Sequence, residues 1–296
     1  MATVNFFIAT AFSSRAFAGN PAAIVLIDLD TSSDILSGIA QNLNQPMTVF
    51  VSPSPRPSHD NSETIIIFGI RFFAPNGGEV PICGHGTVAA AKAMANIPGL
   101  ISEKVETIEF QTLTHGSIIA TKLDDGWIEI LLPAPVTQDV SSDERKRLTP
   151  IMNKMFGREV AINNIAHGGK GFENYLLVEL HEDERLADCV VDVDALRGNG
   201  YFVNIVTTSS SGNESFVSRM FSPEFLPAGE DSVCGSAHCL LGPYWCQKLS
   251  IPAGQEVKAR QVSARGGDLR LIWHQQVGNM QLRGQAAMIG SGQLHI

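Results

Sequence analysis

Short apolar stretches with the composition of β-strands recur along the first half of the chain. Clear examples are TVNFFIATAF at 3–12, TIIIFGIRFFA at 64–74 and WIEILLPAP at 127–135, with turn-forming residues between them. β-Branched and aromatic side chains fit the pleated surface of a sheet, so these segments predict strands. The pattern therefore indicates that a sheet dominates this half of the chain.

Two segments predict helices that lie inside the molecule. GTVAAAKAMANI (86–97) has small or apolar residues on nearly every face, and Lys92 is its only charged residue. A helix that is apolar all round is a buried helix. CLLGPYWCQKL (239–249) has the same character, but its Gly-Pro step at 242–243 predicts a short or kinked helix, because proline removes a backbone donor.

The segments that lead into these two helices are copies of one pattern. FGIRFFAP (68–75) and FVSRMFSP (216–223) both read Phe-x-x-Arg-x-Phe-x-Pro. After each comes a glutamate that is followed, four residues later, by a cysteine and a glycine, in EVPICG at 79–84 and in EDSVCG at 230–235. Several motifs in the same order at one offset of about 150 residues indicate an internal repeat.

The repeat predicts an α+β protein of two homologous lobes, each a mixed sheet curled around one central helix. We place the N-terminal lobe at 1–125 and the C-terminal lobe at 126–296, with the last strand free to return to the N-terminal lobe. A chain of 296 residues is long enough for two such cores. A pseudo-twofold between the lobes would bring the two cysteine-bearing helix starts face to face across a cleft.

Charge and cysteine content narrow the class of protein. The net charge is −9 and the longest basic cluster is ERKR at 144–147, which argues against nucleic acid and anionic membranes as partners. No stretch reaches the roughly 20 apolar residues of a membrane span. The N-terminus resembles a signal peptide, but it lacks a basic start and contains Arg15. Five cysteines, an odd number, suit reduced thiols, so a cytoplasmic protein is expected.

Cys83 and Cys234 are the candidate reactive groups. Each comes directly before a predicted helix, where free backbone N–H groups and the helix dipole bind anions and favour thiolate over thiol. Gly84 and Gly235 let a ligand approach the backbone closely. A small carboxylate held between two such turns would meet a sulfur on each face of its α-carbon, which suits a racemase. A lone cysteine is usually a small buried residue, and it is the repeat that favours a function here.

The sequence predicts neither a cofactor nor a metal. It contains no Gly-x-Gly-x-x-Gly, no Walker loop and no Cys-x-x-Cys pair. A zinc site made of Cys234, His238 and Cys239 is disfavoured, because two of these ligands are adjacent in the chain. Cys189, Cys239 and Cys246 are interpreted as core residues.

Three further features each have two interpretations. His85 is either a packed residue of the first helical turn or an acid–base group. Asp231 either complements a helix N-terminus or acts in the site. HGGKG at 167–171 is either an anion-binding loop or, more simply, a flexible turn. The residues alone leave these alternatives open.

The chain resembles the PhzF-like (phenazine-biosynthesis-like) family of the diaminopimelate-epimerase-like superfamily. The resemblance rests on FAGNPAAIVL (17–26), CGHGTVAAA (83–91) and EDSVCGSAHCLLGPYW (230–245), and it extends over nearly the whole chain. It implies the diaminopimelate-epimerase-like fold, with two barrel-like lobes around central helices and a cofactor-free active site. It also implies isomerase chemistry by proton transfer next to a carboxylate.

The family's active-site residues carry over position by position. Its His, Asp and Ser fall on His85, Asp231 and Ser236, and Asn20 falls where the substrate's carboxylate or amino group would bind. The family's catalytic Glu lies in a segment resembling Asn-Leu-Ser-Glu-Thr-x-Phe-Val, which here reads NQPMTVFV. Met47 takes the place of that Glu and is expected to line the substrate site. A thioether cannot shuttle protons, which puts the Glu-based reaction in doubt.

That departure points toward the cysteines. The two racemase cysteines of the superfamily fall on Cys83 and Cys234, whereas the phenazine enzyme lacks them. CGHGT also resembles the first cysteine motif of proline racemases. Gly84, Gly86 and Gly235, which flank the two cysteines, are expected to contact the substrate.

The expected function is a cofactor-independent amino-acid racemase or epimerase in which Cys83 and Cys234 transfer the α-proton. The alternative is a double-bond isomerase or lyase on a small carboxylate, with His85 and Asp231 as the acting groups. A non-catalytic carboxylate binder is the third class. A small-molecule carboxylate is the predicted partner, and a homodimer is left open.

Overall fold

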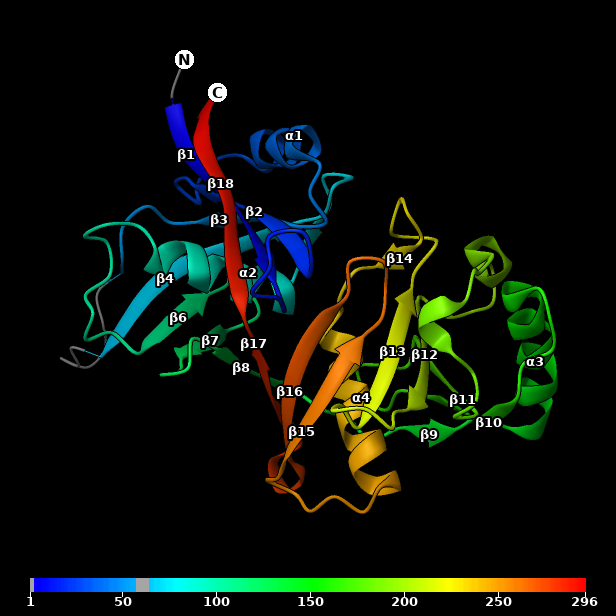
Figure 1. The fold of residues 1–296 in the computed structure, drawn as a ribbon. Coiled ribbons are helices and arrows are strands. Elements are labelled where there is room, and N and C mark those ends of the chain that lie inside the picture. Colours follow the sequence, from blue (N-terminus) through cyan, green and yellow to red (C-terminus); the bar gives the residue numbers. More distant parts are fainter. Residues whose placement is uncertain (1–2, 57–63) are drawn as a thin grey trace. The chain divides into compact units, whose positions relative to one another are not determined.

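The computed structural model describes residues 3–56 and 64–296, and the chain forms two compact units (Figure 1). The first unit contains Met1–Leu132 and Arg283–Ile296. The second unit contains Pro133–Leu282. The two ends of the chain therefore belong to the same unit.

The first unit is a mixed sheet built from β-branched and aromatic segments. β1 and β18, which come from opposite ends of the chain, run side by side as antiparallel strands (Figure 1). Its elements are β1 (Thr3–Ala11), β2 (Asn20–Leu26), α1 (Ser33–Leu43), β3 (Thr48–Val51), β4 (Ile65–Phe73), β5 (Glu79–Val80), α2 (Gly84–Ala95), β6 (Thr107–Gln111), β7 (Ser117–Lys122), β8 (Ile128–Pro133) and β18 (Ala286–His295).

α2 is the buried helix of the first unit. Nine of its twelve residues are buried, and it packs against β1, β2, β3 and β18. Its small side chains allow strands to approach it on several sides. The buried helix predicted at 86–97 is confirmed, and it begins at Gly84, directly after Cys83.

The second unit is also a mixed sheet with one buried helix. Its elements are β9 (Gln138–Asp139), α3 (Ser142–Phe156), β10 (Ile162–His167), β11 (Tyr175–Leu180), the 3-10 segments η1 (Leu186–Asp188) and η2 (Val193–Leu196), β12 (Val203–Ser209), β13 (Phe216–Phe221), β14 (Glu230–Asp231), α4 (Gly235–Lys248), β15 (Glu256–Gln261), β16 (Gly267–His274), the 3-10 segment η3 (Gln275–Val277) and β17 (Asn279–Gly284).

The two units repeat one order of strand pairings. In the first, β2 runs parallel to β3, β3 antiparallel to β4, β4 antiparallel to β5 and parallel to β6, and β6 antiparallel to β7. In the second, β11, β12, β13, β14, β15 and β16 repeat these pairings in the same order and directions. α2 and α4 occupy equivalent places, after β5 and after β14. The predicted α+β fold of two homologous lobes is confirmed.

α4 corrects one expectation about its length. Of the two outcomes that the Gly-Pro step predicted, a short helix or a kink, the short helix is wrong, because α4 runs for 14 residues with Pro243 inside it. Eleven of those residues are buried. Gly242 lies so close to Met280 that an added Cβ would be 2.2 Å from its Cε. Dense packing around the helix therefore supports it where proline removes a backbone donor.

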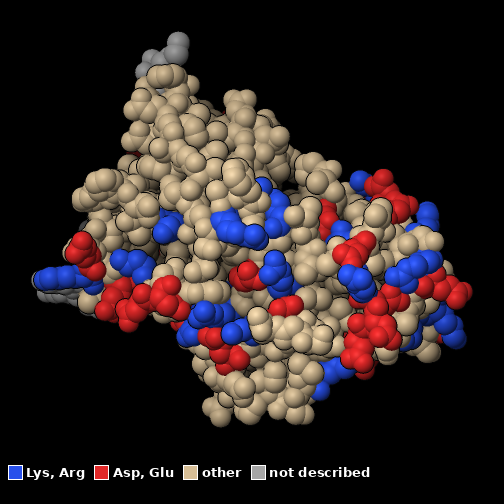
Figure 2. All heavy atoms as spheres, in the orientation of Figure 1, with Lys and Arg blue, Asp and Glu red and all other residues tan. Residues whose placement is uncertain are grey.

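The surface carries charges of both signs. On the face shown in Figure 2, Lys and Arg side chains are interspersed with Asp and Glu. Within the described residues, no helix has the length and apolar character that crossing a membrane requires.

Candidate functional site

The turn before α2 is held by an ion pair between two strands. Arg71 on β4 binds both carboxylate oxygens of Glu79 on β5, with Nε–Oε1 and Nη2–Oε2 distances of 2.8 Å. Its Nη1 also donates to the carbonyl of Leu29 at 3.2 Å, and its guanidinium lies 5.2 Å from the ring centre of Phe73. The pair fastens β5 to β4 just before the chain enters Cys83.

The turn before α4 is built in the same way. Arg219 on β13 binds Glu230 on β14 with an Nε–Oε1 distance of 2.7 Å and an Nη2–Oε2 distance of 2.8 Å. Its Nη1 donates to the carbonyl of Cys189 at 2.7 Å, and its guanidinium lies 5.1 Å from the ring centre of Phe221. The repeated Arg, Phe and Glu of the sequence are thus one structural device made twice.

Cys83 is the N-cap residue of α2. Its sulfur accepts a hydrogen bond from the backbone N–H of Gly86 at 3.4 Å, and it lies 3.3 Å from Nδ1 of His85. The hydroxyl of Thr87 donates to the carbonyl of Cys83 at 2.8 Å. The thiol is therefore fixed at the positive end of a buried helix, beside a histidine ring.

His85 is buried and uncharged at neutral pH. Desolvation by burial lowers its pKa from 6.5 to about 4. A neutral imidazole has one ring nitrogen that accepts a hydrogen, so His85 is able to serve as a partner for the thiol of Cys83. The structure places His85 at this turn, where it is able to be a packed residue or an acid–base group.

Met47, Gly86 and Asn20 lie at the same end of the first unit's sheet. A Cβ added to Gly86 would be 3.3 Å from Cγ of Met47 and 3.3 Å from Sγ of Cys83. Met47, which is buried, directly precedes β3, and its carbonyl accepts a hydrogen bond from Ala23 on the parallel strand β2 at 2.9 Å. Asn20 begins β2 and is fully buried.

Cys234 is the N-cap residue of α4, and its surroundings differ from those of Cys83. Its sulfur lies 3.3 Å from the hydroxyl of Ser236. Its backbone N–H donates to Oε1 of Gln261 at 2.9 Å, and Nε2 of Gln261 donates to the carbonyl of Asp231 at 2.6 Å. One buried glutamine thus holds both sides of the turn that carries Asp231, Cys234 and, one residue later, Gly235.

His238 supports the same turn from inside the helix. Its Nδ1 lies 2.7 Å from the carbonyl oxygen of Cys234, which makes Nδ1 the donor, and its ring stacks on Phe216 with 6.1 Å between ring centres. Burial lowers the pKa of His238 from 6.5 to about 4, partly offset by that hydrogen bond. Thr87 makes the equivalent bond to Cys83 in the first unit.

Tyr175 is a residue of this site that sequence reasoning missed. Its hydroxyl donates to Oγ of Ser236 at 3.1 Å, although 61 residues separate them in the chain. Burial raises the pKa of Tyr175 to about 12, and the nearby Cys234 adds to the effect. No local motif marks Tyr175. The available signal was its place four residues after the HGGKG segment, at the start of the apolar stretch YLLVEL.

The two cysteines inside α4 differ from Cys234, which precedes the helix. Cys239 and Cys246 lie inside the helix and are buried, and burial raises the pKa of Cys239 to about 12 and that of Cys246 to about 11. The core interpretation is confirmed for these two cysteines, but Cys189 is only partly buried, because it packs against the edge of a core cluster and lines a hollow. Among residues 3–56 and 64–296, no three His, Cys, Asp or Glu side chains are arranged to hold a metal ion.

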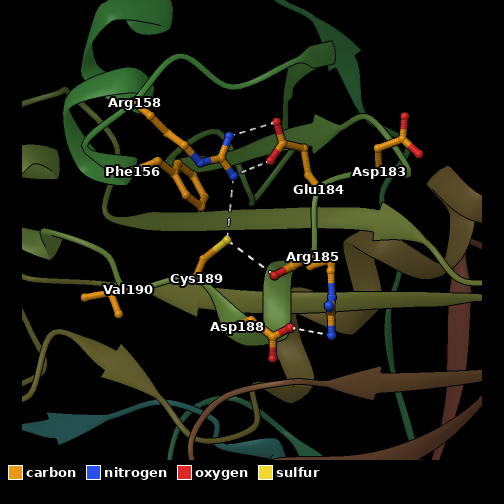
Figure 3. Close-up of a pocket in the computed structure, with 8 residues that line it drawn as sticks. All are labelled: Phe156, Arg158, Asp183, Glu184, Arg185, Asp188, Cys189 and Val190. Carbon is orange, nitrogen blue, oxygen red and sulfur yellow. Dashed lines mark hydrogen bonds and ion pairs between the residues drawn. The ribbon is translucent and has the colours of Figure 1, made fainter.

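A separate hollow of about 500 Å³ opens on the second unit (Figure 3). Arg158 binds both carboxylate oxygens of Glu184, and Arg185 binds Asp188 at 2.7 Å. The thiol of Cys189 donates to the carbonyl of Arg185 at 3.3 Å. Because its arginines are already paired with carboxylates, this hollow is a poor anion site compared with the two cysteine turns. It is lined by Phe156, Arg158, Asp183, Glu184, Arg185, Asp188, Cys189 and Val190.

Comparison with known proteins gives one consistent family. The family model described as phenazine biosynthesis-like protein matches residues 9–292. The phenazine biosynthesis-like domain-containing protein of Homo sapiens is 30% identical, over 97% of this chain and 98% of that protein. A protein of Halalkalibacterium halodurans named as an uncharacterized isomerase is 31% identical, over 98% of this chain and 97% of its own length.

Solved structures resemble the chain over its full length. A phenazine biosynthesis protein of the PhzF family from Enterococcus faecalis has a TM-score of 0.81 and 26% identity, and the match covers 100% of both chains. A hydroxyproline epimerase from Agrobacterium vitis has a TM-score of 0.55 and 11% identity, covering 99% of this chain and 91% of that one. At 11% identity, the likeness to the hydroxyproline epimerase shows a similar fold.

Proposed function

Because the chain belongs to the phenazine biosynthesis-like family, we propose that it is a cofactor-independent isomerase that moves the α-proton of a small carboxylate between Cys83 and Cys234. The two cysteines are the reason for proposing a racemase or epimerase of an amino acid or similar acid. The relative named as an isomerase supports the more general class, an isomerase.

One observation carries the proposal: the same cysteine turn is built twice. Cys83 and Cys234 are both N-cap residues of buried helices, and both follow an Arg–Glu pair with the same two-pronged geometry. A cysteine that only filled space would not need a matched support in each unit. Two equivalent thiols match a reaction that treats the two faces of one carbon alike.

The chemistry follows from the position of the thiols. The thiolate of one cysteine takes the proton from the α-carbon, and the thiol of the other gives a proton to the opposite face. Negative charge that develops on the substrate is stabilised by backbone N–H groups at a helix start, where the helix dipole is positive. After one turnover the thiol and the thiolate have exchanged roles.

Met47 favours the thiols over a carboxylate base. It is buried and lies close to Gly86 in the turn that carries Cys83. A thioether has no exchangeable proton, so Met47 contributes an apolar wall and not an acid–base group. The proposed substrate therefore carries an apolar portion that contacts this wall.

A double-bond isomerase or lyase acting through His85 and Asp231 is the second candidate. It is favoured by the 3.3 Å contact between His85 and Cys83, which places a neutral imidazole at the same helix start. Replacement of the two cysteines with alanine separates the two candidates, because it adds no bulk beside His85. It abolishes proton transfer if the cysteines act, and it leaves activity if His85 and Asp231 act without them.

Deuterium incorporation tests the proposal directly. Single enantiomers of amino and hydroxy acids are incubated with the protein in D₂O, and substrate and product are analysed early in the reaction. A thiol carries one exchangeable hydrogen, so the product should contain close to one deuterium at the α-carbon while the remaining substrate stays protonated. Product that retains protium would indicate a single base and contradict the cysteine pair. A protein that binds these acids without any exchange would be a binder.

A further inference from the structure

The two cysteines have different hydrogen-bond partners. Cys83 lies beside His85, whereas Cys234 lies beside Ser236, which in turn is bound by Tyr175. The distances are 3.1 Å from the Tyr175 hydroxyl to Oγ of Ser236 and 3.3 Å from there to Sγ of Cys234. The second unit thus contains a chain of two hydroxyl groups that ends on a sulfur.

We propose that Tyr175 is a positioning residue for Cys234, and that it acts through Ser236 to direct a hydroxyl hydrogen onto the sulfur and so favour the thiolate. The inference concerns a site residue that neither the sequence motifs nor the family resemblance indicated. It deepens the proposed function, on which its meaning for catalysis rests.

The state of Tyr175 determines which way the hydrogen bonds from Tyr175 to Ser236 to Cys234 are donated. Burial raises the pKa of Tyr175 to about 12, so its hydroxyl stays protonated and remains a donor. Ser236 accepts this hydrogen bond, which leaves its own hydrogen for a neighbour, and the sulfur of Cys234 is 3.3 Å away. Donors in a chain polarise one another, so Ser236 becomes a better donor to a negative charge. A thiolate accepts such a bond but cannot donate one.

The loop before Tyr175 fixes the position of its ring. The backbone N–H of Tyr175 donates to the carbonyl of Phe172, and the N–H of Gly168 donates to the carbonyl of Tyr175, both at 2.9 Å. The rings of Phe172 and Tyr175 are 4.8 Å apart. Gly168 is required here, because an added Cβ would be 2.2 Å from the carbonyl oxygen of Phe172. The HGGKG segment thus folds into the turn that supports Tyr175.

Three other titratable groups among the described residues interact with Tyr175 or with the turn of Cys234. Asp231 from β14 and Cys239 from α4 interact electrostatically with Tyr175, and both raise its pKa. His238 from α4 binds the carbonyl of Cys234 and is neutral above about pH 4. Of these three groups none is positively charged at neutral pH. Tyr175 and Ser236 contribute neutral hydroxyl donors, and in the proposal these donors take part in favouring a thiolate at Cys234.

The test is the titration of each thiol by NMR, in protein labelled with ¹³C at the cysteine Cβ. The signals are assigned with single Cys→Ser variants, and no substrate is needed. In Y175F the midpoint for Cys234 should rise by about one pH unit, because the thiolate loses a polarised donor. The midpoint for Cys83 should not move. S236A, which removes the hydroxyl through which Tyr175 acts, should also raise the midpoint for Cys234.

Y201F is the matched control. Tyr201 is another partly buried tyrosine of the second unit, and its hydroxyl donates to Glu144 at 3.2 Å, so its loss should leave the midpoint for Cys234 unchanged. An unmoved or lowered midpoint in folded Y175F overturns the proposal. If Y175F does not fold, S236A carries the test, and an unmoved midpoint there overturns it as well.

The titration and the exchange experiment test two separate proposals, and each proposal can be contradicted without the other. If no acid exchanges its α-hydrogen but Cys234 titrates as expected in Y175F, the proposed function is wrong and the role of Tyr175 stands. If exchange occurs and the titration of Cys234 does not change in Y175F, the proposed function stands and the role assigned to Tyr175 is wrong. With an active substrate, Y175F should also lower kcat more than it changes KM, because Tyr175 reaches the sulfur only through Ser236.

Discussion

Arg71 donates two hydrogen bonds of 2.8 Å to the carboxylate of Glu79, four residues before Cys83. Arg71 is buried, whereas Glu79 is partly exposed. The guanidinium also reaches the carbonyl of Leu29 and the hydroxyl of Ser33. A planar donor fork with this many partners fixes the short hairpin before α2, and the hairpin determines where the chain enters the helix.

We expect R71K to lower the free energy of unfolding by about 2–3 kcal/mol, because lysine cannot make the two-pronged bond and leaves buried acceptors unsatisfied. R185K is the matched control, since Arg185 pairs with Asp188 at 2.7 Å on an exposed surface and should cost less than about 1 kcal/mol. Chemical denaturation measures both values. Equal costs in the two variants would show that the buried Arg71 does not stabilise its hairpin through the pair with Glu79.

C83A and C234A should each reduce α-proton exchange by on the order of 10²–10⁴-fold, the usual contribution of an acid–base group. Both variants should fold, because the change removes one atom from a residue at a helix start. C189A is the control, since Cys189 lies at the separate hollow and contacts neither turn through its side chain. Exchange that persists at a near-normal rate in either C83A or C234A would rule out the two-thiol mechanism.

Met47 offers a test of the apolar wall. M47E should weaken substrate binding and lower stability, because it buries a carboxylate close to Gly86 in a tightly packed turn. M47L keeps the volume and polarity and should behave like the natural protein. The substrate KM and the denaturation midpoint are the measurements. Unchanged kinetics in M47E would place Met47 outside the site.

Local patterns in the sequence predicted the fold and the two helix starts, but not the long-range contacts around them. The Cys-Gly turns and the buried helices are formed by residues that are close together in the sequence. The internal repeat shows this local pattern twice. Gln261 and Tyr175 reach the turn of Cys234 from strands 27 and 61 residues away from their partners. Such contacts depend on which strands pair, and no local pattern specifies that. The length of α4 was misjudged for the same reason, because its support at Pro243 comes from packing.

Acid should destabilise the protein through its two buried histidines. His85 and His238 have pKa values lowered from 6.5 to about 4, mainly by burial, whereas in the unfolded chain they titrate near 6.5. Between pH 6.5 and pH 4 the unfolded state therefore binds protons that the native state does not. The stability that each neutral histidine contributes is complete above pH 6.5 and is lost as the pH falls toward 4.

Each histidine should account for a loss of about 2 kcal/mol between pH 7 and pH 5. H238T removes one of the two histidines. Threonine is chosen because Thr87, at the equivalent position of the first unit, already binds the carbonyl of Cys83 through its hydroxyl. H238T should be less stable than the natural protein at pH 7, since it leaves a cavity, but it should lose about 2 kcal/mol less between pH 7 and pH 5. H115T, at an exposed histidine, should keep the full acid dependence. Denaturation curves at the two pH values give these differences, and an acid dependence in H238T as steep as in the natural protein would show that His238 does not resist protonation in the folded state.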